Sequence, residues 1–215
     1  MVFGTMKEEI FLALFLLPLL AFSGCEKTSK EVMKGGGEMV EEKIDLTGKK
    51  VLMVVAPQDF RDEEFFEPRE ILAAAGAEVV VSSQRTPEAT GLSGGKTKID
   101  KDLAEVRASD YDAVVFIGGG GATVYFDDPL ALNLAKAAFT ADKVVAGICI
   151  APTILAKADF LRGRRVTAFS SERGVLEAAG AIYTGEAVTV DGKIITANGP
   201  AAATEFGRKI AAALR

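Results

Sequence analysis

The sequence predicts one α/β domain in which helices cover both faces of a mostly parallel sheet, giving a three-layer sandwich. Short, continuous apolar runs recur along the chain after Lys50, and such runs are typical of strands buried on both faces. Helix-like segments separate several of these runs, and strands that alternate with helices form parallel sheets. We therefore expect a single domain over residues 50–215, a length that suits one core.

Each expected element follows from its local pattern. A helix is expected from about Asp62 to Ala75, because apolar residues form a stripe along it and Gly76 follows. A second helix is expected to begin near Pro152, and a last one to span about Ala201 to Leu214. The buried strands are expected at Val51–Val55, Val79–Val81, Ala113–Ile117 and Val144–Ile148.

Two segments carry hairpin signals. Asp191-Gly192 lies between two β-type runs, 187–190 and 193–196, which indicates a type I′ hairpin. The segment 90–97 superficially resembles a phosphate-binding loop, but Thr90 stands where that loop requires glycine. No strand feeds directly into it, so we expect a surface hairpin there.

Charge and composition exclude several classes of function. The net charge is −5 and no basic stripe is visible, which argues against a nucleic-acid partner. The chain has no histidine, so a His-based zinc site and a Cys-His or Ser-His pair cannot form. Acid–base chemistry near neutral pH must then come from Cys, Glu, Asp, Lys or Tyr. We expect neither a metal nor a cofactor.

The first 25 residues have the features of an export signal. Ile10–Phe22 is an apolar run, too short to span a membrane but suited to the hydrophobic part of a signal peptide. Ser23-Gly24-Cys25 follows and resembles a lipoprotein cleavage box, which predicts lipidation of Cys25, a lipid anchor in the membrane and a location in the cell envelope. Residues 26–49 read as a polar tether. The alternative is a fortuitous leader, with translation starting at Met33 or Met39 and a cytoplasmic protein.

The position of the functional site follows from the predicted sheet. In open α/β sheets ligands bind beyond the carboxyl ends of the strands, at the point where the strand order reverses. Three segments meet that description: Pro57–Glu64, Gly118–Ala122 and Cys149–Pro152.

The segment Gly147–Pro152 resembles a nucleophile elbow, in which a strand ends, one residue occupies a strained turn and a helix starts at once. Cys149 occupies the turn, and Pro152 is suited to the first helical turn. The free N–H groups and the positive end of that helix would favour thiolate over thiol. The alternative is a small, inert buried side chain, but the elbow favours a reactive cysteine.

Two further features would assist Cys149. The glycine run Gly118–Gly121 can direct backbone N–H groups toward a developing oxyanion, although it is also consistent with a simple tight turn. Glu64, if kept protonated by burial, could donate a hydrogen bond to the sulfur. For Asp62 and Glu63 we favour a solvated acidic start of the helix.

Together these residues resemble the DJ-1/PfpI family over about Lys50 to Leu214. The resemblance rests on four segments: 59–64 with Pro68 after it, Phe116–Gly119, the Gly147–Pro152 elbow, and 196–200 leading to Glu205-Phe206. It implies a flavodoxin-like fold and a homodimer or larger homo-oligomer. By position it also implies that Cys149 is the reactive group, Glu64 the hydrogen-bonding carboxyl, and the N–H groups of Gly119 and Ile150 the oxyanion pocket.

The chain departs from the family at the histidines. Protease-like members carry His directly after the nucleophile, where this chain has Ile150. Other members supply a His from a later strand, and the corresponding stretch here offers Phe169. A peptidase of the Cys-His kind is therefore not expected.

Three functions remain open at this point. The first is an enzyme, a glyoxalase-like lyase or a deglycase- or amidase-like hydrolase, acting through Cys149 on small carbonyl compounds or on the modified proteins that carry their adducts. The second is a redox-responsive or chaperone-like stress-response protein in which Cys149 is oxidised. The third is a non-catalytic binding module of the envelope.

Overall fold

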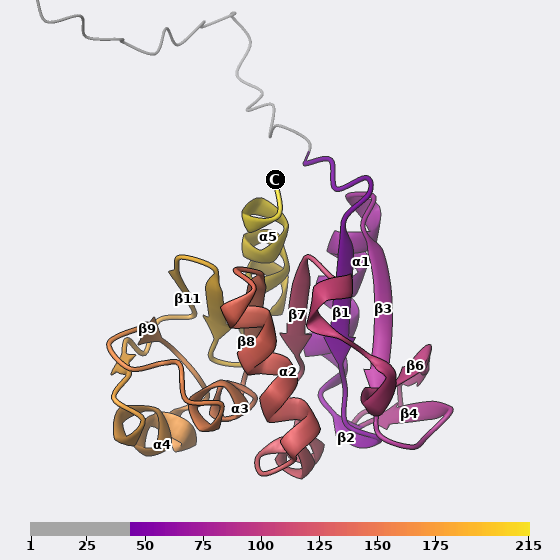
Figure 1. Cartoon of the computed structure of the whole chain (residues 1–215). Coiled ribbons are helices and arrows are strands. Elements are labelled where there is room, and N and C mark those ends of the chain that lie inside the picture. The colour runs from indigo at the N-terminus through magenta and orange to yellow at the C-terminus, as the bar shows by residue number, and fades with distance from the viewer. Residues whose placement is uncertain (1–43) are drawn as a thin grey trace, which may run out of the picture. The chain divides into compact units, whose positions relative to one another are not determined.

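The computed structural model describes residues 44–215, and a seven-stranded sheet forms the centre of this part of the chain (Figure 1). The strand order is β11-β12-β8-β7-β1-β3-β6. Every neighbouring pair is parallel except β11 and β12, which form the predicted antiparallel hairpin. The structure therefore confirms the predicted mostly parallel α/β class. The predicted type I′ turn at Asp191-Gly192 is wrong, because Asp191 pairs with Ile194 and of the two loop residues, Gly192 and Lys193, only Gly192 has a positive φ.

The strands of this sheet are short and, near its centre, completely buried. They are β1 (Lys50–Val54), β3 (Glu78–Ser83), β6 (Lys101–Asp102), β7 (Ala113–Phe116), β8 (Val144–Ile148), β11 (Val188–Asp191) and β12 (Ile194–Ala197). The small sheets are formed by β2 (Gln58–Phe60), β4 (Glu88–Gly91) and β5 (Lys96–Lys98), and by β9 (Arg165–Val166) and β10 (Ile182–Tyr183).

The helices lie on both faces of the main sheet. They are α1 (Asp62–Ala74), α2 (Pro129–Thr140), α3 (Pro152–Lys157), α4 (Arg173–Ala178) and α5 (Ala203–Ala213). Helices α1 and α5 pack on the face that carries Val51 and Met53 of β1, whereas α2 and α3 pack on the face that carries Leu52 and Val54. This alternation follows from the two-residue period of a strand. Figure 1 shows the two helical layers with the sheet between them.

Helices α1 and α5 pack closely against each other at Gly207. A Cβ atom at this position would lie 2.9 Å from Cα of Pro68 and 3.0 Å from Cδ1 of Ile71. We therefore expect Gly207→Ala to lower the free energy of unfolding by about 1–3 kcal/mol, as overpacking does in well-packed cores. Urea denaturation measures this change.

Gly174 provides the matched control, because it also lies in a helix and a Cβ there would meet nothing within 4 Å. Gly174→Ala should leave the stability unchanged or raise it by up to ~1 kcal/mol through better helix propensity. Equal effects of the two substitutions would contradict a close α1–α5 contact.

The predicted elements are found with small shifts at their ends, and two helices were missed. The helix expected from Asp62 is α1, the segment at 90–97 is the β4–β5 hairpin, and the last helix is α5 preceded by a 3-10 turn at Pro200–Ala202. Sequence patterns did not predict α2 or α4. Leu46, in the range expected to be tether, is fully buried and its N–H donates to the carbonyl of Ala75 at 2.7 Å.

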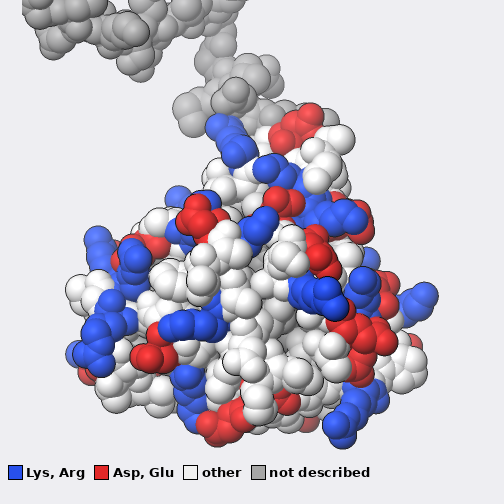
Figure 2. Space-filling model, viewed as in Figure 1, with Lys and Arg blue, Asp and Glu red and all other residues white. Residues whose placement is uncertain are grey.

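The predicted signal segment, its Cys25 and most of the predicted tether lie outside the described residues. Within residues 44–215 no helix is both long and apolar enough to cross a membrane. The same residues contain no cluster of three or more Cys, Asp or Glu side chains suited to a metal ion. Acidic and basic side chains are interspersed over the face shown in Figure 2, without a basic stripe.

Candidate active site at the sheet's carboxyl edge

Three loops meet at the carboxyl ends of β1, β7 and β8, where the strand order reverses. The N–H of Arg61, which follows β2, donates to the carbonyl of Gly118 at 3.1 Å. Gly119 has a φ of 91°, and a Cβ there would lie 2.4 Å from the backbone N of Arg61. Only glycine allows this contact, so the glycine run is a packed junction and its N–H groups are held in fixed directions.

Cys149 lies in the turn directly after β8 with a φ of 63°. This left-handed conformation is strained for a residue with a side chain. Two hydrogen bonds hold it: the Cys149 N–H donates to the carbonyl of Ala197 at 2.9 Å, and the Cys149 carbonyl accepts the N–H of Phe169 at 2.8 Å. The ends of neighbouring segments thus fix the backbone of this half-buried, free cysteine.

Glu64 is completely buried in the first turn of α1, beside Cys149. A Cβ at position 118 would lie 2.5 Å from its Oε2 and 2.6 Å from Cβ of Cys149, so the absence of a side chain at Gly118 lets the two groups meet. Within the described residues neither carboxyl oxygen has a hydrogen-bonding partner of full geometry. A buried carboxyl without such partners is expected to hold its proton strongly.

Burial raises the pKa of Glu64 from 4.5 to about 7, against the stabilising effects of the Cys149 thiol, the Arg61 guanidinium and the Gly118 N–H. Near neutral pH this carboxyl is therefore present in both forms. That is the property required of a group that takes and returns protons.

The pKa of the Cys149 thiol is raised from 9.0 to about 12, by burial first and then by the charge of Glu64. The N–H groups of Gly119 and Ile150 lower it, as the elbow suggests, but their effect is smaller. The prediction of a preformed thiolate is therefore wrong, because desolvation outweighs the helix start. Ionisation of either group opposes ionisation of the other, because the two lie side by side in a buried site.

The remaining acidic residues of α1 have structural contacts. The Asp62 carboxylate accepts the N–H groups of Ser93 at 2.7 Å and Gly95 at 2.8 Å, and thereby holds the β4–β5 turn against the helix. The prediction of a solvated helix start is wrong for Asp62, because this hairpin folds over it. Glu63 forms an ion pair with Arg61 at 2.8 Å; its side chain is 41% exposed, although the two paired atoms are buried.

Sequence reasoning gave Arg61 and Ala197 no individual role in the site, and it named Phe169 only as the residue that stands in the place of a histidine. Arg61 acts on the charge of Glu64, and the other two hold the backbone of Cys149. Arg61 lies in the quoted 59–64 segment, so the signal was present there. The roles of Ala197 and Phe169 involve only backbone groups, which no side-chain pattern reveals.

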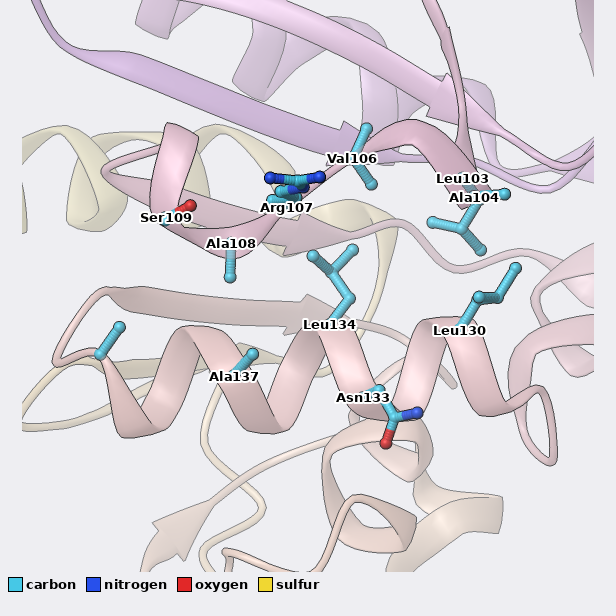
Figure 3. Close-up of a pocket in the computed structure, with 11 residues that line it drawn as sticks. Leu103, Ala104, Val106, Arg107, Ala108, Ser109, Leu130, Asn133, Leu134 and Ala137 are labelled. Carbon is cyan, nitrogen blue, oxygen red and sulfur yellow. The ribbon is translucent and has the colours of Figure 1, made fainter.

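A separate cavity of about 440 Å³ lies between α2 and the segment Leu103–Ser109. Figure 3 shows Leu130, Leu134 and Ala137 along α2, facing Val106 and Ala108 across it. None of its lining residues belongs to the three loops that meet at Cys149, so it is distinct from the candidate active site.

Comparison with known proteins places these residues in a family. The model of the DJ-1/PfpI family matches residues 49–213. An uncharacterised protein of Methanocaldococcus jannaschii is 38% identical over 177 residues, covering 81% of this chain and 86% of its own. YraA of Bacillus subtilis, whose name proposes cysteine protease activity, is 35% identical over 75% of this chain and 95% of its own.

Solved structures agree. A ThiJ/PfpI domain protein from Brachyspira murdochii has a TM-score of 0.76 at 38% identity, covering 78% of this chain and 98% of its own. DJ-1beta of Drosophila melanogaster has a TM-score of 0.70 at 31% identity, covering 77% and 90%. The chain therefore belongs to the DJ-1/PfpI family.

Proposed function

We propose that this protein is a cysteine-dependent enzyme that converts small reactive 2-oxoaldehydes, or their adducts on other molecules, into 2-hydroxy acids. The observation that carries the proposal is the fully buried Glu64 carboxyl, with a pKa of about 7, beside the Cys149 thiol. A base of this pKa can take the thiol proton at neutral pH, so the reaction needs neither a preformed thiolate nor a histidine.

The first step forms a bond between the sulfur of Cys149 and the aldehyde carbon. The thiol proton passes to the Glu64 carboxylate, and the electron pair of the C=O bond moves to the oxygen. The N–H groups of Gly119 and Ile150, which already stabilise charge on the sulfur, support the developing oxyanion. Protonation of this oxygen by Glu64 gives a hemithioacetal and returns the carboxylate.

The second step moves a proton within the substrate. The Glu64 carboxylate removes the hydrogen of the former aldehyde carbon and returns it to the adjacent carbon, while the proton of the hemithioacetal hydroxyl passes to the oxygen of the neighbouring ketone. This oxidises the aldehyde carbon to a thioester and reduces the neighbouring ketone to an alcohol, so no external oxidant or reductant is required. Water then hydrolyses the thioester, which releases the 2-hydroxy acid and restores the thiol.

Turnover of methylglyoxal to lactate tests the proposal. We expect wild-type kcat/KM to rise with pH, with a midpoint near the Glu64 pKa of about 7, because the deprotonated carboxylate is the base. Cys149→Ser should lose turnover, and Glu64→Gln should lower it by about 10²–10⁴-fold.

Other outcomes favour other functions. Oxidation of Cys149 by peroxide without turnover would favour the redox-responsive alternative, although a raised thiol pKa works against it because the thiolate is the oxidisable form. A thiol that resists alkylation until the protein unfolds would favour the binding module.

The expected export, the lipid anchor at Cys25 and the homodimer remain proposals. Incorporation of labelled lipid into wild type but not into Cys25→Ser would support the anchor. Sedimentation analysis would give the oligomeric state.

A further inference from the structure

A cavity of about 370 Å³ lies beside segments that hydrogen-bond to the backbone of Cys149, and it has no part in the chemistry proposed above. Two of the segments that line it are 168–170 and 198–201. The first is tied to Cys149 through the Phe169 N–H, and the second begins directly after Ala197, whose carbonyl accepts the Cys149 N–H. The cavity is therefore joined to the nucleophile by the backbone of these two segments, although Cys149 is not among the residues that line it.

No charged side chain lines this cavity. Its walls include two aromatic rings, Phe169 and Tyr183, and the Phe169 side chain is 47% exposed although it is large and apolar. The Tyr183 hydroxyl donates to the carbonyl of Ala168 at 3.1 Å, and the Arg173 guanidinium lies 5.6 Å from the centre of its ring. Tyr183 is thus held in place, while Phe169 presents open ring surface.

The polar groups of the lining are neutral. The Asn198 carboxamide and the Ser170 hydroxyl have no hydrogen-bonding partner within residues 44–215, so both are available to an occupant. A carboxylate or phosphate would meet no cation among the residues that line the cavity to offset its loss of water. An uncharged aromatic or aliphatic group would bury apolar surface against Phe169 and satisfy at most a few hydrogen bonds.

We propose that this cavity binds the substituent of the substrate, and that the preferred substrates are 2-oxoaldehydes carrying an uncharged aromatic or bulky aliphatic group. This inference rests on the proposed function and specifies its substrate class. Phe169 is the specificity-determining residue, because its exposed ring contacts the substituent. Methylglyoxal, whose substituent is a single methyl group, leaves most of the cavity unfilled.

Initial rates with phenylglyoxal and methylglyoxal test the inference. We expect wild-type kcat/KM to be at least ~10-fold higher for phenylglyoxal, since apolar contacts discriminate by about 10–200-fold. Ala201→Phe, at an exposed lining position, should fill the cavity and bring this ratio toward one. Val190→Phe, at an exposed position outside the cavity, should keep the wild-type ratio. A wild-type ratio near one, or an unchanged ratio in Ala201→Phe, would overturn the inference.

A second measurement separates this inference from the proposed function. This measurement requires no turnover. It compares the rates at which iodoacetamide and N-benzyliodoacetamide alkylate Cys149, and each rate is divided by the rate of the same reagent with free N-acetylcysteine. We expect a preference for the benzyl reagent in wild type and in Val190→Phe that is lost in Ala201→Phe. If both oxoaldehydes are inert but this preference is found, the proposed function fails, whereas the binding of an uncharged aromatic group in the cavity is supported. If the preference is absent, the inference fails whatever the turnover.

Discussion

The free energy of unfolding of the wild-type protein should fall by about 3 kcal/mol, relative to that of a Glu64→Gln variant, as the pH rises from about 4 to about 8. The pKa of Glu64 is about 7 in the fold and 4.5 for an unperturbed side chain. Between these values the folded protein binds a proton that the unfolded chain has lost, so stability decreases with rising pH. Each unit of pKa corresponds to about 1.4 kcal/mol.

Urea denaturation at each pH measures the effect, and the difference between the two proteins removes the contributions of other titrating groups. Glu70→Gln is the matched control, because Glu70 lies in the same helix and its side chain is exposed. Its unfolding curve should follow that of wild type at every pH. Parallel stability profiles for wild type and Glu64→Gln would show that Glu64 titrates as an ordinary carboxyl.

Replacing Gly121 with alanine should destabilise the protein by about 3 kcal/mol or more, the upper end of overpacking effects. A Cβ atom there would lie 1.9 Å from the carbonyl oxygen of Gln58 and 2.9 Å from Cβ of Ala56. The contact is with backbone and cannot be relieved by rotating a side chain. The loop that holds Arg61 and the Gly119 N–H must therefore shift, and alkylation of Cys149 should change with it.

The neighbouring Gly120 is the control, because a Cβ at that position would meet nothing within 4 Å. Gly120→Ala should change the free energy of unfolding by no more than ~0.5 kcal/mol, as exposed substitutions usually do. Thermal or urea denaturation of the two variants side by side gives the comparison. Equal stability of the two variants would mean that the glycine run is a loose turn.

The parts of the fold that sequence could predict are those whose pattern is local. Residues 51–55 and 144–148 are apolar without interruption because both faces of the sheet are covered. Such a run can be recognised as a buried strand from the sequence alone. Helix α2 also has a local signal, because Asp128 caps it by accepting the N–H groups of Leu130 and Ala131, and Pro129 occupies its first turn. The two-residue strands β9 and β10 exist only through pairing with each other, which no local pattern encodes.

The candidate site divides in the same way. The position of Cys149 after a buried strand and before a proline could be predicted, because the elbow is a local motif. The direction in which the pKa of its thiol is shifted could not be predicted, since the shift depends on burial beneath loops from distant parts of the chain. The role of Asp62 likewise requires the hairpin turn at 93–95 to fold onto α1.

At position 149 the left-handed backbone favours glycine for stability, whereas reactivity requires the thiol of a cysteine. Any side chain there carries strain of about 1–2 kcal/mol, and glycine alone avoids it. Random substitution under selection for thermal endurance alone would drift toward glycine at residue 149. A lineage that keeps cysteine there retains the strained backbone, and in return it keeps the thiol and the contacts of this side chain with the core.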